Sequence, residues 1–250
     1  MTIAALDIGN YRAKLALVSK DGEIISRSHF FTGDLLENDQ PVLDRLRDMK
    51  ANGCVVGCVV PELEDELAKT LSSWKPLFVS GNTKNELIVE YDPLESLGAD
   101  RLAGAVGAYR EYGKILNRGI MLVDSGTTVT TDLISSKGAF LGGAIYPGDE
   151  MAMNSLAQYT KRLPKMPFKR TRTVLGSSTR ECMLIGVQAT IIGAIENLYH
   201  RYGRIHGENP FIVLTGASAS WIASNLDIPN MVDPDLVLLG LSAIWSYNRE

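Results

Sequence analysis

The stretch that decides the fold is the segment IAALDIGN at residues 3–10, an apolar run that ends in an Asp-x-Gly turn. The same pattern returns as IMLVDSGT at residues 120–127. The two aspartates, Asp7 and Asp124, lie 117 positions apart, and the glycines that follow them have the same separation. Each copy continues through a strand-like stretch to a polar turn. The chain is therefore predicted to contain two related halves, each opening with a β-hairpin.

Two such halves facing each other would put two carboxylates and two glycine turns around one cleft. Glycine lets backbone N–H groups approach phosphate oxygens closely. Carboxylates at the strand ends would hold a divalent cation that carries phosphates. Neither a P-loop nor a G-x-G-x-x-G motif occurs in the chain. The sequence therefore predicts a nucleotide site of a different construction.

The composition places bounds on the class of protein. A chain of 250 residues can build one large domain or two small ones. The net charge of −4 argues against broad nucleic-acid binding. No apolar run approaches the roughly 20 residues that a membrane helix needs, and no basic segment precedes the first apolar run. We therefore expect a cytoplasmic protein with no nucleic-acid or membrane partner.

The three cysteines do not make a disulfide framework. Cys54 and Cys58 lie in the apolar run at residues 54–60, which favours small core residues over metal ligands. The three histidines form no spaced cluster, and no Ser-His-Asp or Cys-His arrangement is indicated.

Hydrophobic periodicity divides the chain into strands and helices. The first half is predicted to contain strands at about residues 2–7, 12–19, 23–30, 54–60, 77–79 and 87–90, and helices at about 41–51, 62–73 and 101–112. The second half is predicted to contain strands at about residues 119–124, 128–134, 139–146 and 211–214, and helices beginning near 149, at 178–203 and at 234–247. This alternation predicts two α/β domains with mixed sheets flanked by helices, at residues 1–115 and 116–250.

Three motifs carry candidate chemistry. Gly98-Ala99-Asp100-Arg101 opens a helix, where Asp100 could be an N-cap. Arg101 is poorly placed for the helix dipole, which indicates an anionic ligand. The second Asp-Gly turn is rich in hydroxyls that could cradle phosphate, although a polar β-turn would also account for it. Residues 161–172 form a basic loop, which reads either as a solvated loop or as a surface that steers an anionic substrate.

Several elements follow one another in a specific order. They are Asp7-Ile8-Gly9-Asn10 with Lys14, Tyr91 before Pro93, Gly98-Ala99-Asp100-Arg101, Asp124-Ser125-Gly126-Thr127, Gly142-Gly143 with Pro147-Gly148, and Ser178-Thr179-Arg180-Glu181. Together they resemble the type III pantothenate kinase family of the actin, heat-shock ATPase and sugar-kinase superfamily. The resemblance covers nearly the whole chain and implies two ribonuclease-H-like (actin-like ATPase) domains with mixed five-stranded sheets.

The resemblance also implies roles for individual residues. The ATP phosphates would be embraced by Asp7, Ile8, Gly9, Asn10, Tyr11, Arg12, Ala13 and Lys14, with Asp7 near a Mg²⁺ ion, and Thr127 would contact ATP. Pantothenate would be bound by Tyr91, Gly98, Ala99, Asp100, Arg101 and Thr179, with Asp100 as the proton acceptor. Asp124 would bind a monovalent cation, K⁺ or NH₄⁺.

The implied reaction is ATP-dependent phosphorylation of pantothenate to 4'-phosphopantothenate, the first step of coenzyme A biosynthesis, by a homodimer. Apolar residues on two sides of the helix at 178–203 also favour a homodimer. The chain departs from the family at Tyr11, where a small hydroxyl is usual, and at Ala217, where a second glycine is usual. Another small-molecule kinase of this fold and a non-catalytic relative remain alternatives.

Overall fold

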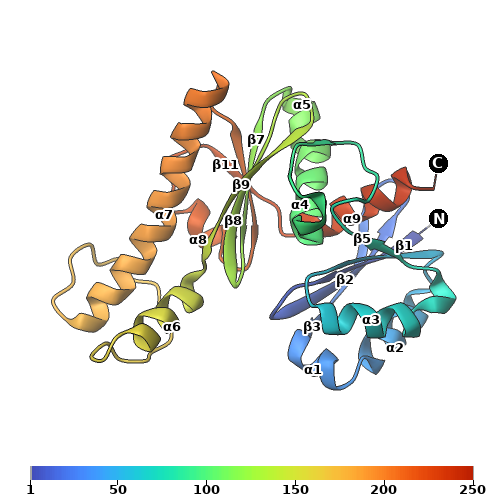
Figure 1. Cartoon of the computed structure of the whole chain (residues 1–250), viewed down its shortest axis with the longest axis horizontal. Coiled ribbons are helices and arrows are strands. Elements are labelled where there is room, and N and C mark those ends of the chain that lie inside the picture. Colours follow the sequence, from blue (N-terminus) through green and yellow to red (C-terminus); the bar gives the residue numbers. More distant parts are fainter. Residues whose placement is uncertain (1, 250) are drawn as a thin grey trace. The chain divides into compact units, whose positions relative to one another are not determined.

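The structure, a computed structural model, describes residues 2–249, which divide into two compact units (Figure 1). Unit 1 contains the chain up to Arg118, the segment Ile134–Gly142 and the chain from Asp235 onward. Unit 2 contains Gly119–Leu133 and Gly143–Pro234. Compactness thus assigns the C-terminal segment to unit 1, whereas the repeat in the sequence places it in the second half. The division of the chain into two similar halves, residues 1–115 and 116–250, stays a prediction.

Unit 1 is built on a mixed sheet of strand order β3-β2-β1-β4-β5. β1 pairs antiparallel with β2 and parallel with β4. The strands are β1 (Thr2–Ile8), β2 (Arg12–Ser19), β3 (Ile24–Phe31), β4 (Gly53–Cys58) and β5 (Leu77–Val79). The side chains of a strand alternate between the two faces of the sheet, so β1 supplies both layers of the core.

One face of this sheet is covered by α2 (Gln40–Met49) and α3 (Pro61–Thr70), and the other by α9 (Leu236–Tyr247). Leu46 and Leu67 are buried against the first face. On the opposite face, a Cβ at Gly57 would lie 3.1 Å from Leu241 of α9. Further helices of unit 1 are α1 (Thr32–Glu37), α4 (Ala99–Ala108) and α5 (Lys114–Leu116), and a π-helical segment, Tyr109–Gly113, joins the last two.

Glycine allows α4 and α9 to pack backbone against backbone. A Cβ at Gly240 would lie 1.8 Å from the carbonyl oxygen of Ala103, and a Cβ at Gly107 would lie 2.3 Å from that of Leu236. No side chain fits at either position. This close approach fixes α4 relative to α9.

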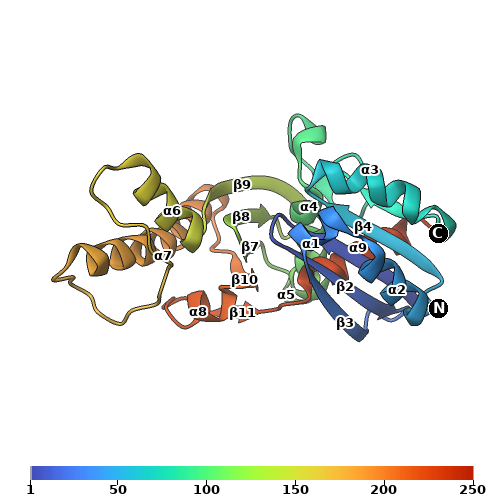
Figure 2. The same ribbon diagram turned by 90° about the horizontal axis from the view of Figure 1, so that it is seen from below.

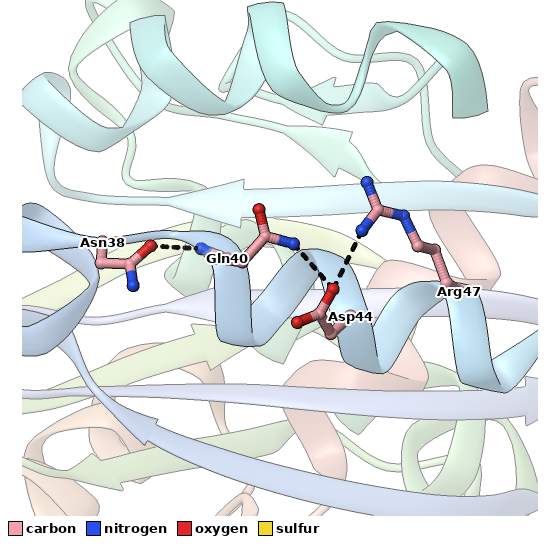
Figure 3. Close-up of polar contacts among 4 residues, drawn as sticks. All are labelled: Asn38, Gln40, Asp44 and Arg47. Atoms are coloured by element: carbon pink, nitrogen blue, oxygen red, sulfur yellow. Dashed lines mark hydrogen bonds and ion pairs between the residues drawn. The ribbon is translucent and has the colours of Figure 1, made fainter.

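A polar network stabilises the first turns of α2 at the surface (Figure 3). Asn38 Oδ1 accepts a hydrogen bond from the backbone N–H of Gln40 (3.0 Å). Asp44 Oδ1 accepts from Gln40 Nε2 (2.7 Å) and from Arg47 Nη1 (2.9 Å). Such exposed contacts support a helix but contribute little to global stability.

Unit 2 repeats the same strand order, as β9-β8-β7-β10-β11. β10 runs parallel to β7 and to β11. The strands are β7 (Ile120–Ser125), β8 (Thr128–Ile134), β9 (Ala139–Pro147), β10 (Phe211–Gly216) and β11 (Asn230–Val232). Within unit 1, the first residues of β9 pair with the short strand β6 (Ile88–Val89). The predicted mixed sheets flanked by helices are confirmed, but the prediction of five strands holds only for the first sheet, because pairing with β6 makes the second sheet six-stranded.

The helices of unit 2 are α6 (Asp149–Tyr159), α7 (Thr179–His206) and α8 (Ala219–Ala223). α6 packs beside α7 (Figure 2). Within α7, helical spacing predicts a core stripe of Met183, Val187, Ile191, Ile195 and Leu198. The first four are buried, whereas Leu198 is only partly buried and the neighbouring Tyr199 is buried instead. This helix is also long and apolar enough to cross a membrane, with 28% of the apolar window buried. That finding corrects the expectation that no such run exists, although one helix of this kind is weak evidence for a membrane span.

The two cysteines of the apolar run at residues 54–60 are core residues, as predicted. Both lie buried in β4. Burial raises the pKa of the Cys54 thiol to about 12 and that of Cys58 to about 11. Thiols held in their protonated form are poor metal ligands.

Candidate functional site

The first Asp-Gly turn connects β1 to β2 and is closed by a hydrogen bond from Gly9 N–H to Arg12 O (3.0 Å). Asp7 is the second-last residue of β1 and is 9% exposed. Lys14 is its register partner on β2, so the two side chains are neighbours on one face of the sheet. The turn therefore carries a carboxylate and an ammonium group side by side.

Side chains around this turn face in different directions. Ile8 and Ala13 are buried in the core of unit 1, so only their backbone groups could meet a ligand. Tyr11 is 62% exposed and packs edge-on against Phe31, with 5.7 Å between ring centroids. The Arg12 guanidinium lies 5.9 Å from each of these two rings. The unusual phenol at position 11 thus packs on Phe31.

A second group of predicted residues meets at Arg101, which is 7% exposed. Arg101 Nη1 donates to Tyr91 Oη (3.1 Å). Its guanidinium carbon lies 5.3 Å from the centroid of the Tyr91 ring and 5.7 Å from that of Phe140. A cation that contacts two aromatic rings and donates a hydrogen bond to one of them is fixed in orientation. The predicted pair Tyr91 and Arg101 is therefore brought together, and Phe140 joins it.

Asp100 lies beside this cation in the first turn of α4. The N-cap of α4 is Gly98, and Asp100 is the second residue of the helix, so the interpretation of Asp100 as an N-cap is wrong. Its Oδ1 accepts from the backbone N–H of Arg101 (2.8 Å). Burial raises the pKa of the Asp100 carboxyl, and the hydrogen bond and charge of Arg101 only partly oppose it. A raised carboxyl pKa suits a general base.

The second Asp-Gly turn connects β7 to β8 and is closed by a hydrogen bond from Gly126 N–H to Thr128 O (2.9 Å). Two other glycines approach it closely. A Cβ at Gly216 would lie 2.5 Å from Asp124 Oδ1, and a Cβ at Gly148 would lie 2.4 Å from Gly126 O. The turn is therefore enclosed by backbone.

Thr215 adds a hydroxyl to this second turn. It is the register partner of Asp124 on the parallel strand β10, so the two side chains lie on one face of the sheet. Within the described part of the chain, Thr215 Oγ1 is buried and has no hydrogen-bond partner. The structure thus leaves a buried oxygen beside the Asp124 carboxylate.

The turn after β10 is unstrained at Ala217. Among residues 2–249, the non-glycine residues with positive φ are Lys50, Lys75 and Asn117, whereas Gly216 has φ +89°. Glycine therefore stands where the left-handed backbone needs it, and alanine is tolerated at the next position. Ser218 Oγ then donates to Asp149 Oδ2 at the start of α6 (3.0 Å).

The remaining predicted residues lie in unit 2. Thr179 is the exposed first residue of α7, so the predicted pantothenate-binding set is divided between the two units. The cations of the loop at residues 161–172 are exposed. The backbone of this loop is held by Gln188, which both donates to and accepts from Thr171. Arg170 lies over the ring of Trp221 (5.5 Å).

Three residues near these groups were not predicted: Phe140, Thr215 and Asp149. Phe140 reads as an ordinary apolar strand residue, and only the pairing of β6 with β9 brings it to Tyr91. Thr215 precedes a glycine at the end of an apolar strand, as Ser125 does, and that similarity was an available signal. Asp149 gave no distinctive signal.

No group of three or more His, Cys, Asp or Glu residues that could hold a metal ion occurs among residues 2–249. A Mg²⁺ ion bound through one or two carboxylates and substrate phosphates needs no such cluster. The donor set at Asp7 is compatible with that mode of binding.

A family model and similar protein sequences agree on one family. The family model described as type III pantothenate kinase matches residues 3–201. A type III pantothenate kinase from Persephonella marina is 32% identical over 256 residues, covering 98% of this chain and 99% of the relative.

Solved structures with the same fold have low sequence identity. The activator of 2-hydroxyisocaproyl-CoA dehydratase from Clostridium difficile has a TM-score of 0.58 at 14% identity and covers 100% of this chain and 95% of its own. A glucokinase from an Antarctic psychrotroph has a TM-score of 0.54 at 13% identity and covers 99% of both chains. These likenesses establish the fold of a two-domain ATPase or sugar kinase.

Proposed function

Because the chain belongs to the type III pantothenate kinase family, we propose that it phosphorylates pantothenate with ATP. The product is 4'-phosphopantothenate, in the first step of coenzyme A biosynthesis. The observation that carries this proposal is the buried Arg101, held by Tyr91 beside the Asp100 carboxylate. A carboxylate substrate with a primary alcohol needs both a fixed cation and a base.

Pantothenate is bound by Tyr91, Thr179 and residues 98–101 in this proposal. Arg101 offsets the charge of the substrate carboxylate, since a guanidinium recognises carboxylates in a fixed geometry. Asp100 orients the primary alcohol and accepts its proton. The alcohol oxygen then bonds to the γ-phosphorus while the bond from that phosphorus to the bridging oxygen breaks, and ADP leaves.

ATP is bound by the first turn, residues 7–14, together with Thr127. The backbone N–H groups of the turn face the phosphate oxygens, and Lys14 adds a positive charge. Asp7 holds the Mg²⁺ ion that neutralises charge on the transferred phosphoryl group. The exposure of Asn10, Tyr11 and Arg12 supports a ligand-facing turn.

A monovalent cation, K⁺ or NH₄⁺, is held at the second turn by Asp124. Carboxylate, hydroxyl and carbonyl oxygens suit a hard cation. The unpartnered hydroxyl of Thr215 beside Asp124 supports this assignment, because a buried polar atom needs a partner.

The active form is a cytoplasmic homodimer in this proposal. α7 presents small residues on an exposed side, including Gly186, Ala189 and Gly193. A Cβ at Gly186 or Gly193 would meet no atom within 4 Å. An open face of small residues on a long helix suits close packing against a second copy.

The test is an assay with pantothenate, ATP, MgCl₂ and KCl, with the product identified by its mass. We expect phosphopantothenate and ADP in equal amounts. Phosphorylation of a hexose but not of pantothenate would indicate another small-molecule kinase. Nucleotide binding without turnover of either would indicate a non-catalytic relative.

A pair of arginine variants tests the substrate site itself. Arg101→Gln removes the guanidinium from its aromatic partners, so the KM for pantothenate should rise about tenfold or more, from loss of a charged hydrogen bond of roughly 1.5–3 kcal/mol. Arg249→Gln is the matched control, since Arg249 also lies over an aromatic ring, that of Trp245 (5.5 Å). An unchanged KM in both variants would contradict the role of Arg101.

A further inference from the structure

Thr32 is a buried threonine that donates hydrogen bonds to two residues of the first Asp-Gly turn. It is the first residue of α1 and is 1% exposed. Its Oγ1 donates to Gly9 O (2.7 Å), and its backbone N–H donates to Tyr11 O (3.1 Å). A single residue, directly after the end of β3, therefore holds the carbonyl groups of Gly9 and Tyr11, in a turn that lies more than 20 positions earlier in the chain.

These two contacts determine where the N–H groups of the turn point. Peptide groups are planar and trans, so each N–H is directed opposite to the carbonyl of its own peptide unit. The N–H of Asn10 is therefore directed away from Thr32, because the Gly9 carbonyl points toward it. The N–H of Arg12 is directed away for the same reason, since it shares a peptide unit with the Tyr11 carbonyl.

Besides the contacts of Thr32, this turn is held by the hydrogen bond that closes the hairpin and by the packing of Tyr11 and Arg12 on Phe31, and neither involves the Gly9 carbonyl. The side chains of Asn10, Tyr11 and Arg12 are all exposed. The hydrogen bond from Gly9 N–H to Arg12 O closes the hairpin but leaves the Gly9 carbonyl to Thr32. Without the Thr32 hydroxyl, the peptide between Gly9 and Asn10 could rotate, and glycine offers little resistance to such rotation.

We propose that Thr32 is a positioning residue for nucleotide binding, which orients the N–H groups of Asn10 and Arg12 toward the phosphates of ATP. Backbone N–H groups exposed along a turn can bind an anion. Thr32 touches no phosphate in this account and acts through the turn. The inference rests on the proposed role of residues 7–14 as the phosphate-binding segment.

The test compares Thr32→Val with Thr32→Ser. Valine keeps the shape and the backbone N–H of residue 32 but removes the hydroxyl, whereas serine keeps the hydroxyl. For the valine variant we expect the KM for ATP to rise about tenfold, equivalent to about 1.4 kcal/mol, with the KM for pantothenate and kcat changed less than twofold. Serine should restore the KM for ATP to within about twofold or threefold of the wild-type value.

Thr131→Val is the matched control, because Thr131 is fully buried in β8 and, among the described residues, its Oγ1 has no hydrogen-bond partner. This variant should leave the KM for ATP unchanged. An equal loss in both valine variants would show a general effect of changing buried threonines and would overturn the proposal. So would a Thr32→Val protein whose KM for ATP is that of the wild type.

Two further measurements decide the role of Thr32 if the valine variant does not fold or if the enzyme shows no turnover. If Thr32→Val does not fold, Thr32→Cys is compared with Thr32→Ser, since they differ only in the donor atom, and an equal KM for ATP would overturn the proposal. Calorimetric binding of Mg²⁺ and a non-hydrolysable ATP analogue gives a Kd that does not depend on turnover. A wild-type protein that binds the analogue but never phosphorylates pantothenate refutes the proposed function, and the Kd ratio of the variants still decides the role of Thr32.

Discussion

The two Asp-Gly turns occupy the same place in two sheets of the same strand order, yet they are held in different ways. A threonine hydroxyl holds the first turn, and the side chains of Asn10, Tyr11 and Arg12 in that turn are exposed. Glycine backbones at positions 148 and 216 enclose the second. The first turn thus leaves N–H groups available for an anion, whereas the second gathers oxygens suited to a cation. One repeated motif can therefore serve two ligands of opposite charge.

The largest effect is expected outside both turns, at Asp100, because in the proposed mechanism the turns bind ligands and Asp100 accepts the proton. Asp100→Asn should lower kcat by about 10²–10⁴-fold, the usual contribution of general-base catalysis. Stability should change by no more than roughly 1 kcal/mol, since the substitution keeps the size of the side chain. The measurement is kcat together with the melting temperature of the same preparation. A near-normal kcat would remove Asp100 from the mechanism.

The same residue makes a prediction about pH. Because burial raises the pKa of Asp100, its carboxyl takes up a proton at a pH above 3.8, the ordinary aspartate pKa. We therefore expect kcat to fall as the pH decreases, beginning above pH 3.8. The free energy of unfolding should instead increase as the pH decreases, since a raised pKa means that the folded state holds this proton more tightly than the unfolded state does. The contribution of Asp100 to stability is present below its unfolded pKa and is lost as the pH rises through its folded pKa. The acid limb of kcat should be absent in Asp100→Asn.

Gly216→Ala should disturb the second turn alone. Gly216 has φ +89°, and the added Cβ would lie 2.5 Å from both Asp124 Oδ1 and Ser125 O. A strained backbone of this kind costs about 1–3 kcal/mol. Gly126→Ala is the control, because its nearest contact would be 3.9 Å away, and it should stay within about 0.5 kcal/mol. Equal stabilities in urea unfolding would show that the second turn is not enclosed as described.

Thr215→Val sharpens the contrast between anion and cation. Loss of one oxygen beside Asp124 should raise the K⁺ concentration needed for half-maximal activity about fivefold, equivalent to about 1 kcal/mol. The KM for ATP at saturating K⁺ should be nearly unchanged. The measurement is a KCl titration of activity at constant ionic strength. A protein that is equally active in Na⁺ and K⁺, before and after the substitution, would remove the cation from the second turn.

The smallest effect is expected on α2, away from both turns. Asp44→Ala removes the hydrogen bonds that its carboxylate accepts from Gln40 and Arg47, and all three side chains are exposed (Figure 3). Such surface contacts contribute about 0–1 kcal/mol. Thermal unfolding should detect little change, and activity should equal that of the wild type. A large loss of activity would mean that sites outside the two turns and Asp100 control catalysis.

Local sequence patterns predicted most of the fold. The Asp-x-Gly repeat indicated two hairpins, and the helical spacing of Met183, Val187 and Ile191 identified the buried stripe of α7. The short elements α1, α8 and β11 were not resolved by periodicity, because three to six residues carry too little pattern. The place of α9 in unit 1 depends on packing against α4, which no local pattern reports.

The candidate site could be predicted where its residues belong to one short sequence motif. Asp100 and Arg101 stand together in one tetrapeptide, so their neighbourhood needed no tertiary information. Thr32 and Phe140 could not be found in this way, because each acquires its role from a partner far along the chain. The question about Ala217 arose from a departure from the family pattern and is resolved because Gly216 adopts the left-handed conformation and Ala217 does not.

Calorimetric binding of a non-hydrolysable ATP analogue to Asp7→Asn and Asp124→Asn tests the contrast between the two turns most directly. Each protein is titrated with Mg²⁺ present, in K⁺ and then in Na⁺. We predict that Asp7→Asn loses Mg²⁺-dependent binding in both salts. Asp124→Asn should still bind the analogue, with the affinity that the wild type has in Na⁺ and no response to K⁺. Loss of the K⁺ response in Asp7→Asn with analogue binding intact, or loss of Mg²⁺-dependent binding in Asp124→Asn, would contradict the assignment of the two turns.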